Sequence, residues 1–284
     1  MNMIDRRDRL AEVFRDTQAF FKENRFLKGS VDKATANAVY YPPDDYPELP
    51  ESADKQGAVR VSGSKTFEAA VGLHKEFPGK KIAVLNFASA TNPGGGVKTG
   101  SSAQEESLCR CSTLYPTLNQ QRMWDLYYSV NRARSDPLHT DACIYSPGIV
   151  ICKTDEPLPQ RLPEARFLSV DVITCAAPDL RERPANFYNP DGGSAVRISP
   201  DGLYELHLKR AKHILHVAAC NGVEVLVLGA FGCGAFHNDP NVVAKAYRAA
   251  LKDYGGRFDL IEFAVYCRDR ETENYDAFKR HLLN

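Results

Sequence analysis

From Ala58 onward, apolar segments of strand length alternate with amphipathic segments of helix length, and no other feature constrains the fold as strongly. The strand-like segments are 58–62, 81–89, 142–153, 166–177, 223–231 and 258–267, and a Pro-Gly pair is expected to divide 142–153 into two short strands. The helix-like segments are 64–77, 101–115, 203–222, 239–256 and 271–283. This alternation predicts an α/β fold in which a mostly parallel sheet lies between helices.

The N-terminal part of the chain has a different character. Apolar residues at helical spacing predict a helix over 4–24, and the proline- and acid-rich segment 39–57 predicts an irregular connector. We therefore expect an N-terminal helical extension and connector over 1–57, followed by one domain over 58–284.

Two predicted helices carry boundary signals. Asp239 before Pro240 is typical of a helix cap followed by proline in the first turn. In 101–115 we expect Ser101 or Ser102 to be the N-cap, and we expect the helix to stop before Pro116.

Two of the expected strands run into glycine-rich loops, LNFASATNPGGG (85–96) and LVLGAFGCGAF (226–236). In open α/β sheets, ligands bind outside the carboxyl ends of the strands. Glycine lets the backbone approach a ligand closely, and N–H groups at a helix N-terminus favour an anion. Two facing loops of this kind would hold a diphosphate, whereas the alternative is a pair of ordinary tight turns.

Neither loop fits the common nucleotide motifs. Gly95 and Gly100 have the spacing of a Walker loop, but Ser101 stands where that motif needs lysine. Thr99 and His237 stand where a dinucleotide fingerprint needs its last glycine. The sequence therefore gives little support to ATP hydrolysis or hydride transfer.

Gln104, Glu105 and Glu106 follow the glycine triplet after seven residues. Acidic residues in a first helical turn can simply complement the helix dipole. Directly after a loop suited to a diphosphate, they are also candidates for chemistry. Adjacent helical side chains point about 100° apart, so the two glutamates cannot perform the same task. One would face the reacting bond, and the other would hold a hydroxyl or pack on the wall.

Composition excludes several classes of protein. The 36 basic residues balance the 36 acidic ones, which argues against a protein that grips duplex nucleic acid through its phosphates. The eight cysteines form no CxxC pair and the histidines are scattered, so we predict reduced core cysteines, no metal site and no cofactor. We see no signal peptide and no membrane span, and we expect a cytoplasmic protein.

The motif NPGGG (92–96), followed by QEE (104–106), SLCR (107–110) and STLY (112–115), resembles the signature of bacterial-type poly(ADP-ribose) glycohydrolases. VLNFASATNPGGG, DVITCAAPD and LVLGAFGCGAFHNDP extend the resemblance in the same order, from about Ala58 to the end. The resemblance implies a macro-domain fold and cleavage of the ribose–ribose O-glycosidic bond of poly(ADP-ribose). It also implies ADP-ribosylated protein as a related substrate, ADP-ribose as product, exo-acting cleavage and a part in reversing ADP-ribosylation, as in the DNA damage response.

The resemblance also implies site residues. Glu106 would be the catalytic acid and base, and Glu105 and Gln104 would support ribose binding and positioning. The implied lining of the distal ribose and diphosphate is Asn92, Gly94, Gly95 and Gly96 in the first loop and Gly232, Cys233, Gly234, Ala235 and Phe236 in the second. Phe236 would pack against the distal ribose. A carboxylic acid beside an apolar wall can have its pKa raised enough to protonate a leaving oxygen.

Two other functions remain open at this point. A non-catalytic macro-domain reader of ADP-ribose would share the glycine loops but would not need an acid at Glu106. A hydrolase of single ADP-ribose marks on protein or DNA would cleave a related bond.

Overall fold

The structure, a computed structural model, describes residues 3–51, 57–185, 190, 192–268 and 271–284. Within them, a seven-stranded sheet has the order β1-β4-β5-β3-β6-β7-β2. The strands are β1 (Val39–Tyr41), β2 (Ala58–Ser62), β3 (Ile82–Ala88), β4 (Cys143–Ile151), β5 (Leu168–Ala176), β6 (Val225–Leu228) and β7 (Leu260–Ala264). Neighbours from β5 to β2 are parallel, whereas β4 is antiparallel to β5 and β1 is antiparallel to β4.

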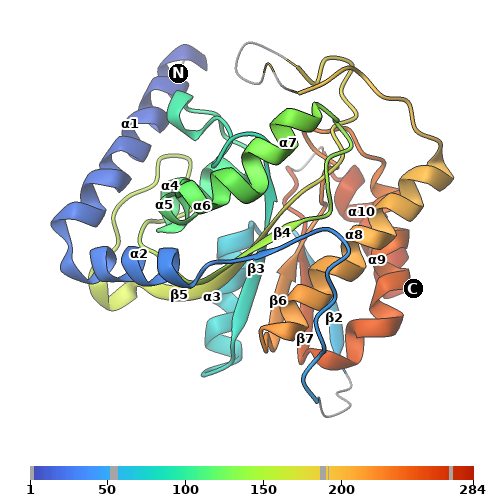
Figure 1. Ribbon diagram of the computed structural model, residues 1–284. Coiled ribbons are helices and arrows are strands. Elements are labelled where there is room, and N and C mark those ends of the chain that lie inside the picture. The colour runs from blue at the N-terminus through green and yellow to red at the C-terminus, as the bar shows by residue number, and fades with distance from the viewer. Residues whose placement is uncertain (1–2, 52–56, 186–189, 191, 269–270) are drawn as a thin grey trace.

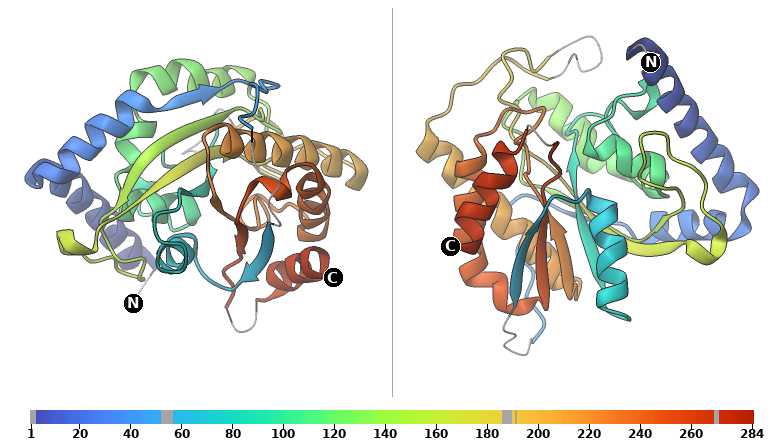
Figure 2. Two further views of the ribbon diagram at one scale, coloured as in Figure 1. Left: turned by 90° about the horizontal axis from the view of Figure 1, so that it is seen from below. Right: turned by 180° about the vertical axis from the view of Figure 1, so that it is seen from behind.

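Helices cover both faces of this sheet (Figures 1 and 2). One face carries α1 (Met3–Glu23), α2 (Arg25–Asn37), α3 (Thr66–Glu76), α4 (Gln104–Cys111), α5 (Leu114–Leu118) and α6 (Gln121–Met123). The other carries α8 (Pro200–Cys220), α9 (Pro240–Tyr254) and α10 (Glu273–Leu283). Alternate residues of β3 serve the two cores: Ile82 packs toward the first group of helices and Ala83 toward the second. The α/β sandwich is therefore confirmed.

Most predicted elements are present, including the helix over α1 and the Asp239 cap of α9, whose side chain accepts from Asn241 N. The predicted connector was wrong at its start, because Val39–Tyr41 forms the edge strand β1. The two strands expected over 142–153 are one strand, β4, with a bulge between Ser146 and Ile149. The boundary at residue 57 stays a prediction.

The helix expected over 101–115 is shorter than predicted at both ends, although it does stop before Pro116 as expected. Ala103, not a serine, is the N-cap of α4, because Ser101 N bonds back to Gly96 O and closes the glycine loop. The helix ends at Cys111, where the chain turns to pair with the end of β4. Pro116 then lies in the first turn of α5, where a missing N–H leaves no helical hydrogen bond unmade.

No helix among the described residues is both long enough and apolar enough to cross a membrane.

Candidate active site

The two glycine loops leave the sheet side by side, because they follow the neighbouring parallel strands β3 and β6. These strands pair only from Ile82 to Val84 on β3, and beyond that point they diverge. In α/β sheets, ligands bind at the point where the connections of the chain lead to opposite sides of one strand. Here β5 lies on one side of β3 and β6 on the other. The topology therefore places both predicted loops side by side at the edge of the sheet where ligands of such folds bind.

The side chain of Gln104 takes the backbone hydrogen-bonding positions on β3 that β6 leaves unpaired where the two strands diverge. Its side-chain oxygen accepts from Phe87 N at 2.9 Å, and its Nε2 donates to Leu85 O at 2.7 Å and to Thr66 Oγ1 at 3.1 Å. The carboxamide thus pairs with the β3 backbone on both sides of Asn86, as a strand residue would. This attaches the start of α4 to β3.

Glu105 is buried against the end of β3. Its carboxylate accepts from Ser89 N at 2.8 Å and from Asn86 Nδ2 at 3.3 Å. Burial, and then the neighbouring Glu106, raise the pKa of Glu105 to about 8. At neutral pH Glu105 therefore retains its proton.

Glu106 faces the glycine loop instead. Its Oε1 accepts from Gly96 N at 2.9 Å, and its buried Oε2 has no hydrogen-bond partner in the described part of the chain. A Cβ placed on Gly95 would lie 2.6 Å from that Oε1 and 3.2 Å from Glu105 Oε2, so both carboxylates flank this glycine. A buried oxygen without a hydrogen-bond partner is costly, so Oε2 is an acceptor that the described residues leave unused.

The glycines of the first loop have the conformations that this approach requires. Gly94 and Gly95 have φ values of +68° and +54°, which side chains with a Cβ rarely adopt. The loop continues through the short helix η1 (Val97–Thr99), and the side chain of Arg7 on α1 donates to Thr99 O at 3.2 Å.

The second loop is fixed by a buried asparagine that the sequence did not reveal. Asn238 Nδ2 donates to the carbonyls of Pro178, Gly232 and Phe236, and its Oδ1 lies 2.8 Å from His207 Nε2. The consecutive N–H groups of Gly234, Ala235 and Phe236 donate no hydrogen bond to the described residues. Successive free N–H groups form a concave site for an anion.

Phe236 is half-buried at the end of this loop, and the Arg181 guanidinium lies 5.3 Å from its ring centroid. The buried carboxylate of Asp179 holds Arg181 with hydrogen bonds of 2.7 and 2.5 Å. Cys233, in the same loop, is partly exposed, and burial raises the pKa of its thiol. The end of the second loop thus carries an aromatic ring packed against an arginine that a buried carboxylate holds in place.

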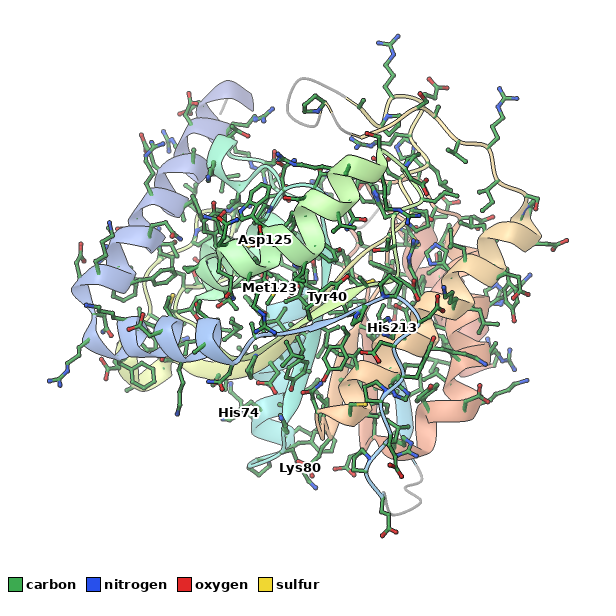
Figure 3. The ribbon with its side chains drawn as sticks, viewed as in Figure 1. Tyr40, His74, Lys80, Met123, Asp125 and His213 are labelled. Atoms are coloured by element: carbon green, nitrogen blue, oxygen red, sulfur yellow. The ribbon has the colours of Figure 1, made fainter. Side chains whose placement is uncertain are left out.

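Some of the supporting residues were visible in the sequence and others were not. Asn86 is a polar residue inside an apolar strand, and such a residue usually has a hydrogen-bonding task. Asn238 and Arg181 had no local signal, because their partners are distant in sequence. Within the described residues no group of side chains could hold a metal ion, and His74 on α3 and His213 on α8 lie far apart (Figure 3).

Comparisons with known proteins show the family to which the chain belongs. Residues 15–154 match the family model for the catalytic domain of microbial-type poly(ADP-ribose) glycohydrolase. The structure of poly(ADP-ribose) glycohydrolase from Thermomonospora curvata bound to the inhibitor ADP-HPD is 30% identical, with a TM-score of 0.80 over 96% of this chain and 99% of that one. The enzyme from Deinococcus radiodurans in complex with ADP-ribose is 34% identical, with a TM-score of 0.75 over 89% of this chain and 96% of that one.

The chain belongs to the microbial-type poly(ADP-ribose) glycohydrolases. The predicted family, the predicted fold class and the predicted enzyme class, a glycosidase that hydrolyses poly(ADP-ribose), are thereby confirmed. No curated protein sequence matches the chain.

The raised pKa of Glu105 predicts how the stability of this glycohydrolase depends on pH. The folded pKa of about 8 lies above the ordinary value of 4.5, so the folded state binds this proton more tightly than the unfolded chain does. That contribution is complete below the ordinary pKa and is lost as the pH rises to about 8. We expect the unfolding free energy of Glu105→Gln, relative to that of the wild type, to increase as the pH rises across this range. Urea denaturation measures the difference. Glu12 is exposed, so Glu12→Gln is the control. A difference between Glu105→Gln and the wild type that does not change with pH would contradict the raised pKa of Glu105.

Proposed function

We propose that this glycohydrolase releases ADP-ribose from the end of poly(ADP-ribose), with Glu106 as the acid and then the base. The observation that carries the proposal is the buried Glu106 carboxylate, bonded by one oxygen to Gly96 N while the other has no partner among the described residues. Glycosidic cleavage needs a proton for the leaving oxygen, and then a base for the attacking water.

The proton is supplied within the glutamate pair. Burial keeps a proton on Glu105 at neutral pH, and this proton would pass to the Glu106 carboxylate, which flanks the same glycine, Gly95. Glu106 would transfer it to the leaving ribose oxygen as the glycosidic bond breaks. Water would then add to the oxocarbenium-like carbon and return its proton to Glu106.

The remaining residues would bind the distal ADP-ribose unit. Asn92 and the glycines 94–96 would line its ribose, and the second loop, 232–236, would wrap the diphosphate with its free N–H groups. Glu105 would hold a ribose hydroxyl. For Gln104 we propose positioning rather than direct contact, because its carboxamide is bonded to β3 and Thr66.

Analysis of the products formed from purified poly(ADP-ribose) tests this function directly. Free ADP-ribose as the first product would support exo-acting cleavage, whereas early oligomers would show internal cleavage. Hydrolysis of single ADP-ribose marks alone, with the polymer intact, would favour the alternative substrate class.

We expect ADP-ribose to raise the thermal midpoint of unfolding much more than adenosine does. The free N–H groups of the second loop are suited to the diphosphate that adenosine lacks, and a ligand stabilises the folded state according to its affinity. A thermal melt with each ligand at equal concentration measures the difference. Equal shifts would contradict diphosphate binding by this loop.

We expect Phe236→Ala to lower the turnover of poly(ADP-ribose) by at least about tenfold, because misplacing a bound sugar by an ångström can cost about a hundredfold. Because Phe236 is only half-buried, its truncation should cost the protein little stability. Phe231→Ala is the matched control, since Phe231 is 1% exposed and its truncation should cost about 3–5 kcal/mol. Turnover per folded molecule and urea unfolding, measured on both variants, distinguish a residue of the site from a residue of the core. Strong destabilisation with normal turnover would make Phe236 a core residue.

We also propose that the protein acts in the reducing cytoplasm, because its eight cysteines are all free thiols and five are buried. There it would reverse ADP-ribosylation, including that which follows DNA damage, without binding duplex nucleic acid directly.

A further inference from the structure

Arg132, on α7 (Ser129–Arg134), holds the segment that leads into the first glycine loop. Its Nε donates to Thr91 O at 2.8 Å, and its Nη2 donates to Asn92 Oδ1 at 2.5 Å. The guanidinium also lies over the Trp124 ring, 4.8 Å from the centroid. Three separate contacts therefore fix this side chain, and two of them end on the loop.

The guanidinium determines which way the Asn92 carboxamide faces. Arginine carries only N–H donors, so the atom of Asn92 that meets it must be the oxygen Oδ1. Nδ2 then points away from Arg132 and lies 3.2 Å from Thr91 Oγ1. The main-chain oxygen of Asn92 accepts from Gly95 N at 2.9 Å, so the glycine turn starts at the same residue. One arginine thus fixes both the carboxamide and the start of the turn.

A π-helical turn brings Arg132 to this position. η2 (Trp124–Tyr128) is π-helical and runs directly into α7. A π turn holds one residue more than an α turn, and one added residue rotates the following ones by about 100°. Met123, directly before this turn, is buried, whereas Asp125 on the turn is exposed (Figure 3). The wider turn therefore sets the direction in which α7 presents Arg132.

We propose that Arg132 is a positioning residue that holds Asn92 and the start of the glycine turn in the geometry that receives the distal ribose. It acts through Asn92 and does not touch the substrate. The inference rests on the proposed function, which gives Asn92 the contact with that ribose. A lysine would keep the charge but could not span both acceptors, because its ammonium lacks the planar fork of arginine.

The test combines Arg132→Ala, Arg132→Lys, Asn92→Ala and the double variant Asn92→Ala/Arg132→Ala in the full chain. Arg134→Ala is the matched control, because Arg134 is exposed on the same helix and pairs with Asp136 at 3.7 Å. ADP-ribose affinity is measured by calorimetry, kcat and KM are measured on poly(ADP-ribose), and urea unfolding gives the folded fraction. The affinity measurement does not depend on cleavage, so inactivity of the wild type on the polymer would count against the proposed function alone.

We expect both Arg132 variants to weaken ADP-ribose binding and to lower kcat/KM by at least about tenfold per folded molecule. The double variant should lose less affinity than the sum of the two single losses, because residues that share a contact are not additive. Additive losses, full rescue by lysine, normal affinity in Asn92→Ala, or losses explained by unfolding would each overturn the inference.

Discussion

Glu106→Gln is expected to lower the turnover of poly(ADP-ribose) to background while ADP-ribose still binds within about tenfold of the wild-type affinity. Glutamine keeps the shape of the side chain and an oxygen that can accept from Gly96 N. It cannot deliver a proton to the leaving ribose or accept one from water, and general acid–base groups contribute about 10²–10⁴-fold to rates. A tenfold change in affinity is only about 1.4 kcal/mol.

Single-turnover cleavage of labelled polymer and calorimetry with ADP-ribose measure the two quantities for Glu106→Gln. The exposed Glu12→Gln serves as control for loss of a carboxylate elsewhere. Near-wild-type turnover in Glu106→Gln would remove this residue from the mechanism. Loss of ADP-ribose binding together with turnover would assign it to substrate binding instead.

Gly95→Ala is expected to lower turnover by about a hundredfold. The new Cβ would lie 2.6 Å from Glu106 Oε1, closer than such contacts allow, so the carboxylate or the loop must move. A displacement near one ångström at a reacting group costs about a hundredfold. The residue also has a φ of +54°, and a left-handed conformation costs roughly 1–2 kcal/mol with a Cβ.

Gly79→Ala separates strain from displacement in this experiment. Gly79 has a φ of +80°, but a Cβ there would meet nothing within 4 Å. We expect a loss of unfolding free energy in both variants, larger in Gly95→Ala, and a loss of turnover per folded molecule in Gly95→Ala alone. Equal turnover in the two variants would show that the loop tolerates a Cβ beside the carboxylates.

The elements predicted from sequence are those whose pattern is determined locally. β3 and β6 are apolar runs buried on both faces, and α9 has a cap and a first-turn proline within its own sequence. By contrast, α2 contains Gly29 in its middle and buries only Leu27 and Ala34 among its described side chains, which leaves little periodicity. β1 has three residues and exists because the edge of β4 was open to pairing.

The same distinction applies to the candidate site. The glycine triplet and the two glutamates are close in sequence, so their proximity in space was predictable. The contact of Arg132 with Asn92 joins residues 40 positions apart and depends on the direction of α7, which a π-helical turn sets. No periodic pattern in one sequence reports such a turn.

The place that Gln104 takes beside β3 has a consequence for the length of the segment before it. Gln104 ties one end of 97–103 to the sheet, while the bond from Gly96 N to Glu106 ties the other end to the helix that follows. A shift of α4 along its axis cannot accommodate a residue inserted between these attachments, because the shift would break the hydrogen bonds between Gln104 and β3. It would have to bulge outward, toward α1, where Arg7 already contacts Thr99. The interval between the glycines and the glutamates is therefore a fixed length set by two anchors, the Gln104 carboxamide on β3 and the bond from Gly96 N to Glu106.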